Sequence, residues 1–89
     1  MIHQLKTDPE AFDAVASGVK TFEIRKNDRR YAVGDTLVLC RTEATGEEMK
    51  AGTPLKFTGD ILQRVVSHIL HGPIYGLADG WVIMSLVRR

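Results

Sequence analysis

The spacing of apolar residues changes at Gly18, and this change limits the folds open to the chain. Before it, Asp8 and Pro9 form a helix start, and apolar residues recur at helical spacing as far as Ala16. From Thr21 onward, apolar and polar residues alternate, as they do in a strand with one buried face. The sequence therefore predicts a short N-terminal helix that leads directly into a sheet.

Four further apolar runs predict strands, so that the chain is expected to form a sheet of about five strands. The expected strands cover residues 2–5, 21–25, 36–41, 60–70 and 81–87. The polar, glycine-containing stretch 42–59 is expected to form a long hairpin excursion. In a chain of 89 residues, closing a bent sheet into a small barrel protects its edge strands economically. We expect one α+β domain, residues 1–89, with the helix covering one end of the barrel.

The strand expected at 21–25 has one apolar and one charged face. Phe22 and Ile24 lie on the first face, and Glu23 and Arg25 lie on the second. Half-buried strands usually turn their apolar face to the core. We therefore expect Phe22 and Ile24 to point inward and the charged pair to point outward.

The junction at Gly18 can also swing Lys20 toward Glu23 and Arg25, beside the mouth of the barrel. Arginine offers a planar fork for phosphate or a base edge, lysine offers a mobile cation or a base, and glutamate offers an acceptor. Such a cluster can recognise a polar ligand. A solvated strand face with an ordinary ion pair is the alternative.

The pattern Gly18-x-Lys20-x-x-Glu23-x-Arg25 resembles the G-x-K-x-x-E-x-R signature of the ASCH (activating signal cointegrator homology) superfamily. The similarity to a small phage and bacterial branch of ASCH-like proteins runs over nearly the whole chain outside 42–59. This resemblance implies a small PUA-like β-barrel of about five strands with one short N-terminal helix. It also implies that RNA or a modified nucleotide binds in a cleft at the helix-to-strand junction, beside the three charged residues of the motif.

The same resemblance raises a second hypothesis, an enzyme. Some small ASCH proteins are amidohydrolases that remove the acetyl group from N4-acetylcytidine, using a lysine, a threonine and a distant glutamate. Lys20 stands at the lysine position, but Glu23 replaces the threonine, and no glutamate follows Glu48. In a hydrolase of modified nucleosides, Lys20 would act as base and Glu23 as acid or acceptor.

The overall charge argues against a non-specific coat for nucleic acid, because 12 basic and 11 acidic residues leave a net charge of +1. The positive charge is nevertheless concentrated in one short stretch. The cations of this stretch are Lys20, Arg25, Lys26, Arg29 and Arg30. Such a cluster can bind phosphates. It can equally be a solvated loop.

Several uncharged or weakly charged residues are weaker candidates. Tyr31 and Tyr75 can each stack on a base, although Tyr31 can instead anchor its loop. His68 is expected to be a partly buried strand residue or to line the cleft, and Trp81 is expected in the core. The histidines and the single Cys40 form no ligand set, so we expect no metal, no disulfide and no cofactor.

The expected partner is RNA or a modified nucleotide. No apolar run approaches the ~20 residues of a membrane-spanning helix, and the first residues lack the form of a signal peptide. We therefore expect a cytoplasmic protein with no membrane partner, present as a monomer or weak dimer. A third hypothesis is a phage accessory protein that binds a host protein through the 42–59 excursion.

Overall fold

The computed structural model describes residues 1–88, and its five strands form one sheet. The elements in chain order are β1 (Ile2–Thr7), α1 (Pro9–Ser17), β2 (Phe22–Lys26), β3 (Thr36–Thr42), α2 (Gly46–Lys50), β4 (Phe57–His71) and β5 (Trp81–Val87). The strand order is β1-β3-β4-β5-β2, with β1 and β3 parallel and every other neighbouring pair antiparallel. The expected α+β class with a five-stranded sheet is confirmed.

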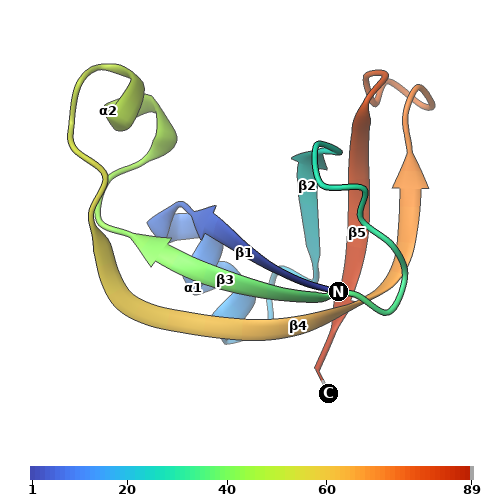
Figure 1. The fold of residues 1–89 in the computed structure, drawn as a ribbon, viewed down its shortest axis with the longest axis horizontal. Helices are drawn as coiled ribbons and strands as arrows, with labels where there is room; N and C mark the ends of the chain where they lie inside the picture. The colour runs from blue at the N-terminus through green and yellow to red at the C-terminus, as the bar shows by residue number, and fades with distance from the viewer. Residues whose placement is uncertain (89) are drawn as a thin grey trace.

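The long strand β4 gives the sheet its curvature. Its first part, from Phe57 to Val65, pairs with β3, and its second part, from Val65 to His71, pairs with β5. The pairing register shifts once in each part, and such irregularities bend a strand. Figure 1 shows β4 curving beneath the molecule and joining two arms of the sheet. The result is a curled half-barrel with β1 and β2 at its two edges.

Arginine side chains, rather than backbone pairing, connect these two edges. Within residues 1–88, no ladder pairs β1 with β2. Instead, Arg25 Nη2 donates to the carbonyl oxygen of Lys6 at 2.8 Å, and Arg29 Nη1 donates to that of Gln4 at 2.9 Å. These bonds satisfy carbonyl groups of an edge strand that has no further neighbour. They hold the edges together while leaving space between them.

One apolar core lies inside the curve and is covered by α1. Its buried members are Leu5, Phe12, Val15, Tyr31, Leu37, Leu39, Val66, Val82, Met84 and Leu86. The helix ends at Gly18, whose φ of 86° is a left-handed conformation that suits glycine. Neither helix within residues 1–88 is long and apolar enough to span a membrane.

The expectation about the faces of β2 is wrong. Glu23 points inward and is 3% exposed, whereas Phe22 and Ile24 are 43% and 47% exposed on the outside. A buried carboxylate is tolerated when it is paired and hydrogen-bonded, and both oxygens of Glu23 accept bonds from cations. Because side chains alternate along a strand, burying Glu23 sends its apolar neighbours outward.

The 42–59 excursion contains a second short helix, α2, where only one helix was expected. A capping box begins it: Glu48 N–H donates to Thr45 Oγ1 at 3.1 Å, and Thr45 N–H donates to Glu48 Oε1 at 2.9 Å. Asp8, which precedes α1, accepts a bond from Gly46 N–H at 3.1 Å. This contact ties the excursion to the start of α1. The strand that follows is also longer than the expected 60–70.

Candidate functional site

A cavity of about 400 Å³ opens where α1, β1 and β2 meet. It is lined by Lys6, Thr7, Asp8, Ala11, Lys20, Glu23, Ile24, Arg25, Lys26, Asp28 and Trp81. Four consecutive residues of β2, 23–26, take part, so the cavity reaches both faces of this edge strand. Its volume falls in the range of small-ligand sites.

Glu23 is the centre of an ion cluster that borders the cavity. Lys20 Nζ donates to Glu23 Oε1 at 3.2 Å, and Arg25 Nε donates to Glu23 Oε2 at 3.0 Å. The carboxylate is buried, but the side chains of Lys20 and Arg25 keep 20% and 24% of their surface exposed. The expected convergence of these three side chains on one cleft is found, with the cations between the carboxylate and solvent.

The guanidinium of Arg25 is fixed by the end of β1. Its Nη2 donates to Lys6 O at 2.8 Å and contacts Thr7 Oγ1 at 3.4 Å, and Thr7 Oγ1 itself donates to Leu5 O at 3.2 Å. The arginine is therefore held before any ligand arrives, which lowers the entropy cost of binding. Thr7 was missed by sequence reasoning, because nothing in the sequence indicates that β1 lies opposite β2.

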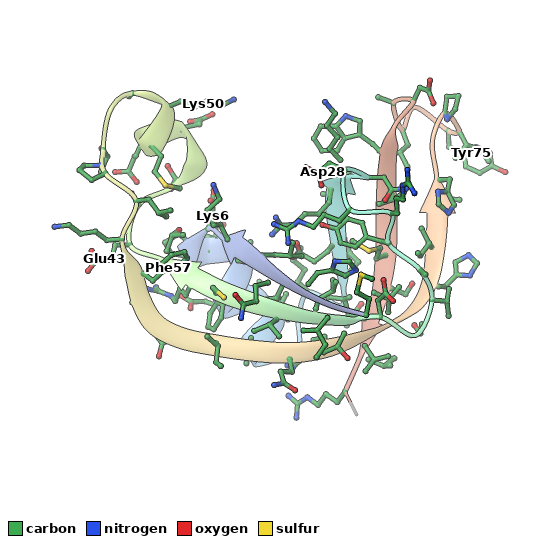
Figure 2. The ribbon with its side chains drawn as sticks, in the orientation of Figure 1. Lys6, Asp28, Glu43, Lys50, Phe57 and Tyr75 are labelled. Carbon is green, nitrogen blue, oxygen red and sulfur yellow. The ribbon has the colours of Figure 1, made fainter. Side chains whose placement is uncertain are left out.

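Charges of both signs line the cavity. The cations are Lys6, Lys20, Arg25 and Lys26, and the carboxylates are Asp8, Glu23 and Asp28. Figure 2 shows Lys6 rising from β1 into the space between α2 and β2, with Asp28 at the tip of β2. Since four positive charges face three negative ones, the cavity suits a ligand with one or two charges better than a long polyanion.

Trp81 lies at this cavity and not in the core, so that expectation is wrong. Its side chain is 40% exposed, and its residue pairs with Lys26 across the β2–β5 ladder. The inward positions of β5 are taken by Val82, Met84 and Leu86. Because strand side chains alternate, Trp81 faces outward, and it becomes an aromatic wall of the cavity.

The remaining predicted residues are spread over the molecule. Lys26 lines the cavity, whereas Arg29 is bonded to β1 and, like Arg30, is exposed and outside the lining. His68 is exposed on β4 rather than partly buried, and it does not line the cavity. Tyr75 is 91% exposed in the β4–β5 connection, also away from the cavity.

Tyr31 is 5% exposed and anchors its loop, so it presents no open ring face to a base. Its ring packs edge-on against His3, with centroids 4.9 Å apart, and its N–H donates to Asn27 Oδ1 at 3.0 Å. Burial raises the pKa of the Tyr31 hydroxyl. These contacts belong to a second polar cluster, whose residues do not line the cavity.

Asp35 is the carboxylate of this second cluster. It lies 2.8 Å from His3 Nε2 and accepts from Ala32 N–H at 3.0 Å and from the Met1 ammonium at 3.1 Å. Burial of the Asp35 carboxyl acts to raise its pKa, but the bonds from His3, Ala32 and Met1 outweigh burial, and the pKa is lowered. Among residues 1–88, no group of three His, Cys, Asp or Glu side chains is placed to hold a metal ion.

Two comparisons with known proteins bear on the chain. A family described as "Domain of unknown function (DUF3850)" matches residues 2–86. An "Uncharacterized 12.9 kDa protein in GpA 3'region" of Escherichia phage P2 is 50% identical over 38 residues, which are 43% of this chain and 35% of the phage protein. The match thus spans about a third of the phage protein, and neither description names an activity.

Proposed function

The chain belongs to the DUF3850 family, and we propose that it binds RNA or a modified nucleotide in the cleft beside Lys20, Glu23 and Arg25. One observation carries this proposal: the three charged side chains of the motif meet at one open cavity of about 400 Å³. Lysine and arginine N–H groups at its wall suit phosphate oxygens and base carbonyl groups.

We further propose that the half-barrel is a PUA-like domain of the ASCH type. The resemblance of Gly18-x-Lys20-x-x-Glu23-x-Arg25 to the superfamily signature supports this assignment. So does the position of the cavity, which lies at the junction between α1 and β2.

The charge of the cavity limits how much nucleic acid it would hold. With a net charge of +1 on the chain and mixed charges at the cavity, contact with one or two phosphates is the expectation. For single strands, the logarithm of affinity falls with the logarithm of salt by about 0.7 per phosphate contact. A shallow salt dependence would therefore accompany binding.

The test measures the affinity of short single-stranded RNA and of tRNA at low and moderate salt. Lys20→Gln is expected to weaken binding about tenfold or more, because it removes a charged donor from the cleft. Arg30→Gln is the matched control, since it removes one positive charge from the same stretch but lies outside the cavity. No binding at low salt, or equal losses in both variants, would refute the proposal.

The hydrolase is a second candidate, favoured by the 3.2 Å contact between Lys20 Nζ and Glu23 Oε1 at the cavity wall. A proton can pass directly between groups at hydrogen-bond distance. The reaction is hydrolysis of an N4-acylated cytidine by water to give cytidine and a carboxylic acid. Chromatography of N4-acetylcytidine incubated with the protein would detect cytidine, and Lys20→Gln should abolish its release. Zero turnover would remove this candidate and leave the binding function standing.

A further inference from the structure

The cavity has an apolar wall that the charged cluster does not explain. Trp81 and Ile24 line it while remaining 40% and 47% exposed. Trp81 is the single tryptophan of the chain. A large aromatic side chain contributes most to stability when it is buried, yet this one lies at the surface, beside a cavity.

The positions around Trp81 suit a flat, polar ligand. Lys26 is its partner across the β2–β5 ladder, and Ile24 lies two residues along the same face of β2. Lys6 also lines the cavity, and Figure 2 shows its side chain rising from β1. The indole of Trp81 offers a face on which a base can stack, and the lysine ammonium groups in the same cavity can pair with a phosphate.

The ion cluster at Glu23 determines which part of a ligand the inner wall of the cavity can bind. Both of its oxygens already accept bonds from Lys20 and Arg25. Because Lys20 and Arg25 carry more N–H groups than Glu23 has remaining acceptor sites, hydrogen-bond donors outnumber free acceptors at that wall. A base that presents carbonyl oxygens matches such a wall better than one that presents amino groups.

We propose that a nucleobase stacks on the indole of Trp81 and that Lys6 and Lys26 bind the phosphate of the same nucleotide. This inference rests on the proposed function and names the residues that would orient its ligand. It places the sugar over the cavity mouth and turns the carbonyl edge of the base toward Lys20 and Arg25.

The test uses the emission of Trp81 as the probe. Uridine 5′-monophosphate is expected to quench this emission, whereas ribose 5-phosphate, which has no base, should not. Trp81→Leu should weaken binding of uridine 5′-monophosphate and of single-stranded RNA about 5- to 150-fold by calorimetry, and Trp81→Phe should retain most of it. Lys26→Gln should weaken binding of the monophosphate more than binding of uridine.

Tyr75→Leu is the matched control, because this aromatic residue is more exposed than Trp81 but does not line the cavity. Circular dichroism would establish that each variant is folded. RNA binding with no quenching and with full affinity in Trp81→Leu would overturn the stacking inference while leaving the proposed function intact. If the wild type bound neither RNA nor the mononucleotide, the stacking inference and the proposed function would both be overturned.

Discussion

Two carboxylates, Glu23 and Asp35, are both buried and paired, but only Glu23 lines the cavity described above. Each is less than a tenth exposed and accepts bonds from several donors. The partners of Glu23 are long side chains that remain partly exposed and border a cavity. Asp35 instead bonds the buried ring of His3, the backbone of Ala32 and the exposed ammonium of Met1, and it does not line the cavity beside Glu23. Burial and pairing alone thus do not indicate a binding site.

The two clusters also differ in whether the side chains bonded to the carboxylate can donate to a ligand as well. Lys20 and Arg25 can direct further N–H groups toward a ligand without leaving Glu23, because each carries more donors than the carboxylate uses. The ring of His3 packs against Tyr31 and is enclosed. We therefore interpret the Glu23 cluster as a binding site and the Asp35 cluster as a structural one.

Glu23→Gln should have the largest effect. It leaves two cations facing a neutral amide, and removing one partner of a buried ion pair costs about 3–5 kcal/mol. Because Lys20 and Arg25 keep access to water, we expect a loss in the free energy of unfolding of about 3 kcal/mol, at the low end of that range. Urea unfolding measures this loss, and RNA affinity should fall with it. A loss below about 1 kcal/mol would show that the cluster contributes little to stability.

Asp35→Asn should have a smaller effect, and only on stability. The amide keeps one acceptor oxygen but loses the charge that strengthens the bonds from His3 and Ala32. Hydrogen bonds to charged groups contribute about 1.5–3 kcal/mol, so we expect a loss of about 2 kcal/mol. RNA affinity should equal that of the wild type at a temperature where both are folded. A selective loss of affinity would contradict the division between the two clusters.

The Asp35 cluster should also appear in the pH dependence of stability. Its pKa in the folded protein is lowered below the unfolded value of about 3.9. The stabilisation is therefore complete above about pH 4 and is lost as the pH falls through the folded pKa. Unfolding curves from pH 6 downward should show the wild type approaching Asp35→Asn below about pH 4. This assignment would be contradicted if the free energies of unfolding of the two proteins differed by the same amount at every pH down to the lowest pH at which both are folded.

The features that depend on residues close in sequence were predicted from local patterns. The start and end of α1 and the alternation in β2 all follow from residues close in sequence. The helix α2 was also predictable, because Thr45-x-x-Glu48 is a capping-box pattern. It was missed because its glycines and polar residues were interpreted as a loop.

The orientation of strand faces could not be predicted in the same way. Alternation separates Phe22 from Glu23 but does not say which face is buried, and here the answer depends on Lys20 and on the backbone of β1. Both faces of β5 are largely apolar, so period two could not place Trp81. The motif predicted the Lys20, Glu23 and Arg25 part of the candidate site, whereas placing Lys6 and Trp81 at the cavity required the three-dimensional arrangement of the strands.

Removing the exposed ion pair between Arg41 and Asp13 should have the smallest effect on stability. This pair shows what pairing contributes when the carboxylate is not buried. Arg41 Nε and Nη2 donate to the two carboxylate oxygens at 3.0 and 3.1 Å, but the Asp13 side chain is 62% exposed. The hydrogen bond from Arg41 lowers the pKa of Asp13. Asp13→Asn should nevertheless leave the unfolding midpoint almost unchanged, and any small shift should vanish as salt is added, because water and ions screen a surface pair. If Asp13→Asn destabilised the protein as much as Asp35→Asn at moderate salt, bond geometry rather than burial would determine the contribution of a carboxylate in this fold.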